Sequence, residues 1–390
     1  MLHNEFKLVP FNSQGYYSIK NDFTINDAKY SPVIKMEAEG TLLVAAYYAD
    51  KYQCVISRPA DISVDELAKL NSEERRFHYL TDWEFVDNIL DLLKPARETH
   101  DQEYREAFIL GPGTAHNIPV IYLREKGEEA ILYANTLAIH TASCIPEFSD
   151  TLKRKHNINV YVVEETRQAD IYSCGVDALA FAKDAVAINK RNGKYRIENL
   201  LTQLKARATR YNNYYSVRLP NELLKTAQIS KFVDLHQENN SKKIHKNETL
   251  AEFRKRYTYE NVEMGNQDKR NLASYLKIKG FKYADIIEIQ FYLNQIRSIM
   301  PLLWSNTIKN DFVGQAKALL KLQGRVNSDE PRDGLYDFTM MFINRILRAN
   351  TISLTQHSVT LFRKKEHPLK QKLLQEADQS KEKGCCCVLM

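Results

Sequence analysis

Two apolar runs on either side of Gly127 constrain the fold of this chain more than any other feature. Residues 117–123 (NIPVIYL) and 130–134 (AILYA) are rich in β-branched and aromatic side chains, which favour β-strands. Residues 124–129 between them are polar and contain Gly127, as expected of a turn. The sequence therefore predicts an antiparallel β-hairpin.

The segments around this hairpin predict an α+β fold. Residues 158–163 (INVYVV) favour another strand. Apolar residues then recur at helical spacing between Gly175 and about Ile188, which predicts a helix. Residues 41–48 fit either a strand or a buried helix, and the chain beyond residue 195 is expected to be mostly helical. Other predicted helices cover residues 63–93, 145–156, 286–300 and 342–347.

Composition excludes several classes of protein. The 390 residues are 44% hydrophobic, enough for a real core. The net charge of +6 is small and dispersed, so nucleic-acid binding is not indicated. There is no signal peptide, no apolar stretch of membrane-spanning length, no phosphate-binding glycine motif and no paired-cysteine zinc motif. We expect no metal, and three scattered cysteines among the six indicate a reducing compartment.

Cys174 lies where a catalytic thiol is expected. It comes directly before the predicted helix that starts at Gly175, and the positive end of a helix dipole favours the thiolate. A buried structural cysteine at a helix terminus is the alternative interpretation.

The hairpin places a base beside a residue that can orient it. His116 lies at its start and Asn135 at its end, so antiparallel pairing predicts that the two are neighbours. Asn135 can accept from one imidazole nitrogen and fix the tautomer, as in Cys-His-Asn sites. Gln168, six residues before Cys174, is placed to donate to an oxyanion together with a backbone N–H.

The order His116, Asn135, Gln168, Cys174 resembles the clan of adenoviral and SUMO-type cysteine proteases. Within this clan the chain most resembles the YopJ family of bacterial effector acetyltransferases. The stretch Ser173–Lys183 (SCGVDALAFAK) carries this resemblance, together with Leu219-Pro220, Lys231-Phe232, His236-Gln237 and Lys242-Lys243. It covers roughly residues 100–270. The family usually has Glu where this chain has Asn135.

The resemblance implies an α+β fold with a papain-like or SUMO-protease-like catalytic core and a mostly helical regulatory part. We expect five segments: an N-terminal segment (1–60), the catalytic core (61–215), a regulatory segment (216–280), a helical extension (281–362) and a flexible tail (363–390).

The resemblance also implies a chemistry. A bacterial protein delivered into a host cell would acetylate Ser, Thr or Lys residues of host proteins from acetyl-CoA, through an acetyl-Cys174 thioester. Inositol hexakisphosphate is the expected activator, and several cations must converge to bind it. Candidate residues are Lys231, Lys242, Lys243, Arg254 and Lys255.

Two alternative functions use the same chain. The catalytic residues would equally serve a cysteine protease that removes ubiquitin or a ubiquitin-like protein. A catalytically impaired interaction module at a host membrane is the second alternative.

The last residues predict lipidation. Cys387-Val388-Leu389-Met390 forms a prenylation signal of the farnesyl type, and Cys385 and Cys386 offer thiols for palmitoylation. A host prenyltransferase and the cytosolic face of a host membrane are therefore expected partners. Two lipids would give the stable attachment that one does not.

Overall fold

The structure is a computed structural model of the chain, which divides into two compact units. One unit consists of Asn12–Gln290 with Asn327–Asp329, and the other of Met1–Phe11, Phe291–Val326 and Glu330–Met390. The residues described are 8, 11, 15–20, 24–25, 28–29, 33–57, 103–110, 116–136, 141–168, 172–238, 241–245, 247–256, 274–323 and 333–361.

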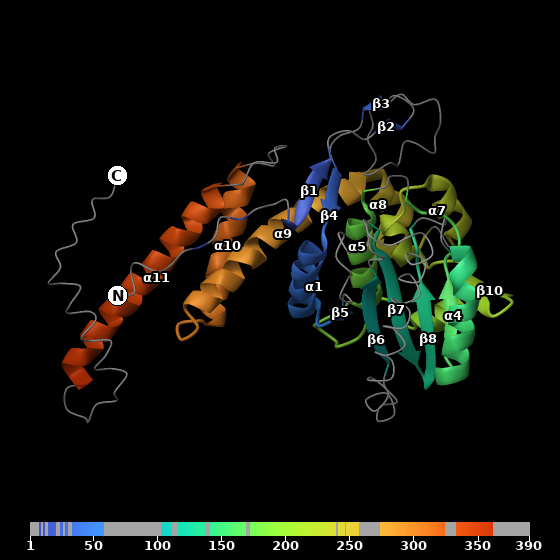
Figure 1. Cartoon of the computed structure of the whole chain (residues 1–390), viewed down its shortest axis with the longest axis horizontal. Helices are drawn as coiled ribbons and strands as arrows, with labels where there is room; N and C mark the ends of the chain where they lie inside the picture. The colour runs from blue at the N-terminus through green and yellow to red at the C-terminus, as the bar shows by residue number, and fades with distance from the viewer. Residues whose placement is uncertain are drawn as a thin grey trace, which may run out of the picture. The chain divides into compact units, whose positions relative to one another are not determined.

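A seven-stranded mixed sheet organises the first unit (Figure 1). Its strand order is β10-β11-β9-β8-β7-β6-β5. The central strands β6, β7 and β8 are antiparallel, whereas β9 pairs in parallel with both β8 and β11, and β5 pairs in parallel with β6. Their bounds are β5 Val55–Ser57, β6 Tyr104–Leu110, β7 Ile118–Glu125, β8 Glu128–Tyr133, β9 Asn159–Val162, β10 Ala208–Tyr211 and β11 Tyr214–Val217.

The predicted hairpin is confirmed as β7 and β8. Its register runs from Val120 opposite Tyr133 to Glu125 opposite Glu128. Lys126 (φ 53°) and Gly127 (φ 77°) both have positive φ angles. A two-residue turn of this kind matches the twist of the adjoining strands, and glycine adopts it without a steric penalty.

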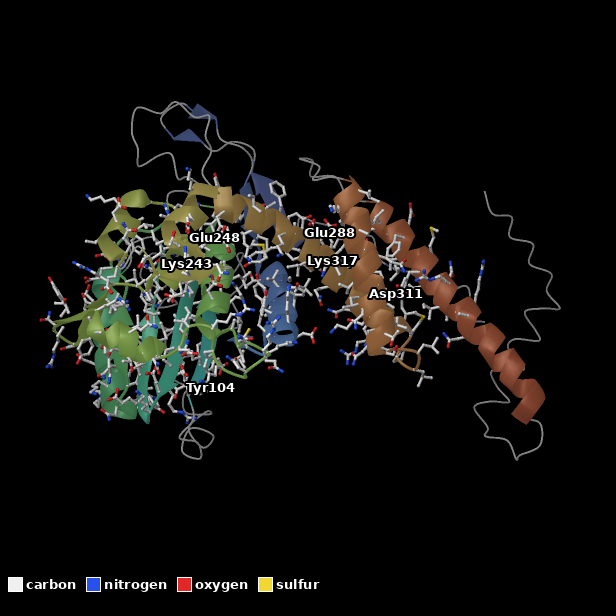
Figure 2. The ribbon with its side chains drawn as sticks, turned by 180° about the vertical axis from the view of Figure 1, so that it is seen from behind. Tyr104, Lys243, Glu248, Glu288, Asp311 and Lys317 are labelled. Carbon is white, nitrogen blue, oxygen red and sulfur yellow. The ribbon has the colours of Figure 1, made fainter. Side chains whose placement is uncertain are left out.

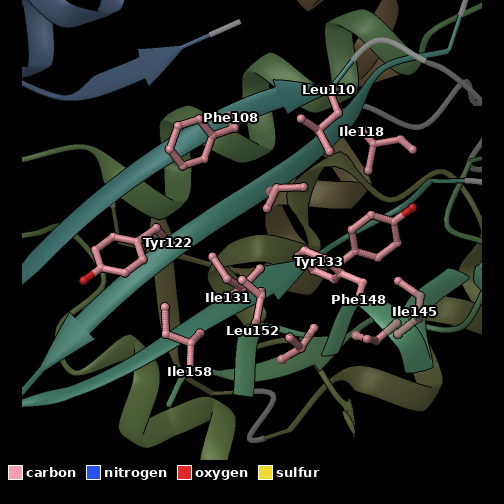
Figure 3. Packing of buried hydrophobic residues seen from close by; sticks show 13 residues of the cluster. Phe108, Leu110, Ile118, Tyr122, Ile131, Tyr133, Ile145, Phe148, Leu152 and Ile158 are labelled. Carbon is pink, nitrogen blue, oxygen red and sulfur yellow. The ribbon is translucent and has the colours of Figure 1, made fainter. Parts of the chain in front are cut away.

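Two helices cover opposite faces of the sheet. Helix α4 (Thr141–His156) contributes Ile145, Phe148 and Leu152 to the hydrophobic cluster drawn in Figure 3. The strands supply alternate residues to this cluster, among them Val120 and Tyr122 of β7. The other face of β6 and β7 packs against helix α5 (Cys174–Val186), which is buried along its whole length. Both helices were predicted.

Shorter elements complete the first unit. Residues 41–48 belong to helix α1 (Ala38–Tyr52), which settles the choice left open by the sequence. The other strands are β1 Tyr17–Lys20, β2 Thr24–Ile25, β3 Ala28–Lys29, β4 Val33–Met36, β12 Lys243–His245 and β13 Glu248–Thr249. The other helices are α6 Leu200–Ala206, the 3-10 helix η3 Asn221–Thr226, α7 Ser230–His236 and α8 Leu250–Arg256.

The region beyond residue 195 contains strands that the mostly helical prediction missed. The β10–β11 hairpin turns at Asn212, which has a φ of 46°. Asparagine tolerates this left-handed conformation, and Thr209, Tyr211, Tyr214 and Val217 around it favour strands.

Three long helices follow on the C-terminal side, where the sequence predicts mostly helix: α9 (Ser274–Ile299), α10 (Asn306–Gln323) and α11 (Asp333–Leu361). Helix α9 begins in the first unit and ends in the second. In the second unit, α10 and α11 run side by side, with Phe312 packed edge-on against Phe342 at 5.2 Å between ring centroids (Figure 1).

Some predictions fall outside the described residues. These are the helices of residues 63–93 and the lipidation cysteines Cys385, Cys386 and Cys387. Within the described helices, none combines the length and apolar character needed to cross a membrane.

Candidate active site

Cys174 is the first residue of α5 and is 1% exposed. The thirteen residues of α5 are all buried, so this helix is held by packing around its whole circumference. The sulfur therefore lies at the positive end of a rigid helix, where the thiolate is favoured. Cys54, which is also buried, does not begin a helix, and burial raises the pKa of its thiol to about 11.

The structure brings His116 and Asn135 together. His116 precedes β7 and Asn135 follows β8. His116 Nε2 lies 2.8 Å from Asn135 Oδ1. An amide oxygen only accepts hydrogen bonds, so Nε2 carries the proton in this pair and Nδ1 carries the lone pair. His116 thus has the tautomer of a general base that acts through Nδ1.

The loop after β9 places Gln168 at the same edge of the sheet. The backbone N–H groups of Arg167 and Gln168 each donate to the Thr136 carbonyl at 3.2 Å. Gln168 is buried and lies next to the residue that follows Asn135. His116, Asn135 and Gln168 therefore lie near the ends of β7 and β8, and Cys174 comes close to this group through the contact of its sulfur with Asn117, the residue after His116.

The sequence interpretation did not identify Arg167, which anchors this loop. It is completely buried, and its Nη2 donates to Asp177 Oδ2 at 2.5 Å and to the Ala134 carbonyl at 3.2 Å. Its Nη1 donates to Thr226 Oγ1 at 3.3 Å, and its guanidinium lies 4.3 Å from the Phe181 ring centroid. Burial lowers the pKa of Arg167, whereas the Asp177 carboxylate raises it. Asp177 is a charged residue on a helix that is buried along its whole length, but the sequence pattern does not show which residue pairs with it.

Asn117 was also missed. Its side-chain Nδ2 donates to Cys174 Sγ at a distance of 3.8 Å, and the residue is buried. The alternation of side chains along the strand could have identified it, because Asn117 lies on the same face of the sheet as the buried residues Ile121 and Leu123.

The five cations predicted to bind polyphosphate have partners or lie exposed. Lys242 Nζ lies 2.8 Å from Glu222 Oε1, and Lys243 Nζ lies 3.2 Å from Glu252 Oε2. Figure 2 labels Lys243 and Glu248 on the small β12–β13 hairpin. Arg254 donates to the Ala227 carbonyl at 2.7 Å, and burial lowers its pKa to about 10. Lys231 and Lys255 are exposed.

A different group of cations converges elsewhere in the first unit. We call it the lysine cluster: Lys51, Lys183, Arg196, Lys225, Lys279 and Lys282. Burial and repulsion by Lys225, Lys279, Arg196 and Lys282 lower the pKa of Lys183. The Asp184 carboxylate contacts two members of the cluster: it lies 2.8 Å from Lys225 Nζ and is in contact with Lys183.

The sequence of the chain matches one family model. The model described as YopJ Serine/Threonine acetyltransferase matches residues 43–277. The chain belongs to the YopJ family. No curated protein sequence matches it.

The solved structures that are similar to this YopJ-family chain include a structure of AvrA and one of HopZ1a. A structure of AvrA delL154 with IP6 and CoA has 16% sequence identity and a TM-score of 0.42, and the match covers 64% of this chain and 87% of the other. A structure of HopZ1a in complex with IP6 has 11% identity and a TM-score of 0.36, with 66% and 85% covered.

The buried pair of Arg167 and Asp177 yields a stability prediction. Asp177→Asn leaves the guanidinium buried without its carboxylate, which is expected to lower the free energy of unfolding by about 3 kcal/mol. The control Glu128→Gln breaks the exposed pair of Glu128 and Lys205 and should cost under about 1 kcal/mol. Urea titrations of both variants measure the difference. Equal losses would contradict the anchoring role of Arg167.

Proposed function

We propose that this YopJ-family protein transfers an acetyl group from acetyl-CoA to Ser, Thr or Lys residues of host proteins, by a ping-pong mechanism through Cys174. Two observations support the proposal: His116 contacts Asn135, and the next residue, Asn117, contacts Cys174 at the start of α5. Family membership supplies the acetyl donor and the protein acceptor.

In the first half-reaction, His116 Nδ1 takes the Cys174 thiol proton. The sulfur bonds to the acetyl carbonyl carbon of acetyl-CoA, and the π electron pair moves to oxygen. The Gln168 amide and a backbone N–H near Cys174 donate to this oxyanion. The intermediate then expels the CoA sulfur, which receives the proton from the His116 imidazolium.

In the second half-reaction, His116 removes a proton from the attacking Ser or Thr hydroxyl or Lys amine. The attacking atom bonds to the acetyl carbon of the thioester, and the tetrahedral intermediate expels the Cys174 sulfur. The imidazolium returns its proton to that sulfur, which restores the resting enzyme.

The first test follows label from acetyl-CoA. Radiolabelled acetyl-CoA with inositol hexakisphosphate is expected to label Cys174 of the wild type, as a thioester that hydroxylamine removes. Cys174→Ala should lose this label. Absence of label together with capture by a ubiquitin or SUMO suicide probe would instead establish the protease alternative. Absence of both reactions would leave the catalytically impaired interaction module.

Asn135 yields a pH prediction. Asn135→Asp is isosteric and puts a carboxylate beside His116, which favours the imidazolium. The acidic limb of the pH dependence of kcat/KM should therefore move to higher pH by about one unit, with a rate above that limb at least equal to the wild type. Asn135→Ala, the matched control, should lower the rate throughout. An unchanged limb in Asn135→Asp would contradict the pairing of residue 135 with the base.

We further propose that inositol hexakisphosphate binds at the lysine cluster. Burial lowers the pKa of Lys279 to about 7, with repulsion by Lys282 and Lys225 adding to the effect. Burial also lowers the pKa of Lys225 to about 8, against the opposing charge of Glu222. Repulsion between neighbouring positive charges destabilises the protein unless an anion neutralises them. The six phosphates of inositol hexakisphosphate would supply the negative charge.

Two cations of the lysine cluster lie close to tyrosine rings of the same unit. Arg196 lies 4.4 Å from the Tyr52 ring centroid, and Lys279 Nζ lies 5.6 Å from that of Tyr283. The predicted residues Lys242 and Lys243 remain the rival site, although each contacts a glutamate.

The lysine cluster predicts how binding depends on pH. Because the folded pKa values of Lys225 and Lys279 lie below the ordinary value, the unfolded chain binds more protons between about pH 7 and 10, and the ligand-free protein should become more stable as pH rises through this range. Anion binding favours the protonated lysines, so affinity should fall as pH rises from about 7 to about 9.

Calorimetry with inositol hexasulfate measures this linkage, since its sulfates do not titrate in this range. Binding at about pH 8 should take up protons, and Lys279→Met should weaken binding about tenfold or more and reduce the uptake. The control is the Lys242→Met, Lys243→Met double variant, which should bind like the wild type. If the double variant alone loses affinity, the rival site is correct.

Lipid attachment at Cys387, with Cys385 and Cys386 as further acceptors, stays a prediction. A host membrane and a host prenyltransferase likewise remain predicted partners.

A further inference from the structure

A side-chain amide reaches the sulfur that the proposed mechanism uses as nucleophile. Asn117 Nδ2 donates to Cys174 Sγ across 3.8 Å. Asn117 comes directly after His116, so two consecutive residues serve the same site in different ways. His116 contacts Asn135, whereas Asn117 contacts the thiol.

The position of Asn117 is fixed by its surroundings. It is 4% exposed and directly precedes β7, whose strand residues are all buried. Successive side chains of a strand point to opposite faces. Ile118 belongs to the cluster beneath α4 (Figure 3), so Asn117 points to the other face, which α5 covers.

Gly175 leaves the space that this approach requires. A Cβ atom on Gly175 would lie 2.7 Å from Met36 Cβ and 3.2 Å from Asn117 Nδ2. Both distances are shorter than ordinary van der Waals contacts between non-bonded heavy atoms. Gly175, the residue after Cys174, therefore has no side chain at the point where β4 and Asn117 pack against the start of α5.

We propose that Asn117 is a further catalytic residue, which donates a hydrogen bond to the Cys174 sulfur and thereby favours the thiolate. The proposal rests on the proposed function of Cys174. An amide N–H binds an anionic sulfur more strongly than a neutral thiol, because hydrogen bonds to charged groups are the stronger ones. No bond forms or breaks at Asn117; its effect is on the proton equilibrium of the sulfur.

This role has a kinetic signature. Loss of a hydrogen bond to a charged group is expected to raise the thiol pKa by about one unit, which leaves about tenfold less thiolate well below that pKa. The remaining thiolate is more basic and therefore about threefold more nucleophilic. Asn117→Ala should thus react about threefold more slowly than wild type near pH 6 and about threefold faster at a pH where both thiols are ionised.

The experiment measures thiol–disulfide exchange of Cys174 with 2,2′-dithiodipyridine between about pH 5 and about pH 10, in the full-length protein. Mass spectrometry assigns the modified residue, with Cys54, whose thiol pKa is raised to about 11, as internal reference. The apparent thiol pKa should rise from wild type to Asn117→Ala and further in Asn117→Asp, because the isosteric carboxylate repels the thiolate.

Asn221→Ala is the matched control. Asn221 is equally buried at 4% and exchanges hydrogen bonds with the backbone of Glu238, so its loss should affect stability without moving the exchange profile. A profile of Asn117→Ala that coincides with wild type at every pH would overturn the proposal. So would a uniform slowing without a crossover.

Acetyl labelling of the same variants separates this proposal from the proposed function. If wild type shows the shifted profile relative to Asn117→Ala but never forms acetyl-Cys174, the acetyl-transfer proposal fails and the role of Asn117 stands. If wild type forms the thioester and both profiles coincide, the role of Asn117 fails alone.

Discussion

The guanidinium of Arg167 sits where three segments of the first unit meet. It bonds to the carbonyl of Ala134 at the end of the hairpin, to Asp177 in the first turn of α5 and to Thr226 at the end of η3. A buried charge without its partners costs several kcal/mol, so the arrangement is favourable only when all three segments are in place. The relative positions of the hairpin, the nucleophile helix and η3 therefore depend on one side chain, and Gln168 follows it directly in the chain.

Two consecutive residues before β7 each contact a residue of the candidate site. His116 and Asn117 are consecutive residues at the start of the hairpin, and His116 contacts Asn135 while Asn117 contacts Cys174. Neither contact requires a flexible loop to find its place, because both residues directly precede the buried strand β7. In the proposed mechanism these contacts would hold Asn117 and His116 in position before the acyl group arrives, which favours nucleophilic catalysis.

Local patterns of the sequence predicted several secondary structure elements. The contacts between residues far apart in the sequence could not be predicted in this way. The hairpin, β9 and α5 were predictable because their residues alternate or recur with a clear period. The contact of Arg167 with Asp177 was not, because no local pattern distinguishes a buried ion pair from two exposed charges. Basic residues close together in sequence, such as Lys242 and Lys243, suggested an anion site, yet each contacts a glutamate. The lysine cluster comes from positions as far apart as Lys51 and Lys282, which no local pattern brings together.

One residue of the lysine cluster, Lys183, lies on the helix that Cys174 begins, at its opposite end. Lys183 is in the last turn of α5 and Cys174 is its first residue. Lys225 directly precedes Thr226, which contacts Arg167. A ligand shifts a conformational equilibrium only through its different affinities for the two states. Under the proposal that inositol hexakisphosphate binds at the lysine cluster, mutual repulsion of the lysines would supply that difference, because the polyanion would neutralise their charges. A ligand that holds Lys225 would therefore also favour the contact of Thr226 with Arg167, whose neighbour Gln168 bonds to the Thr136 carbonyl after the hairpin.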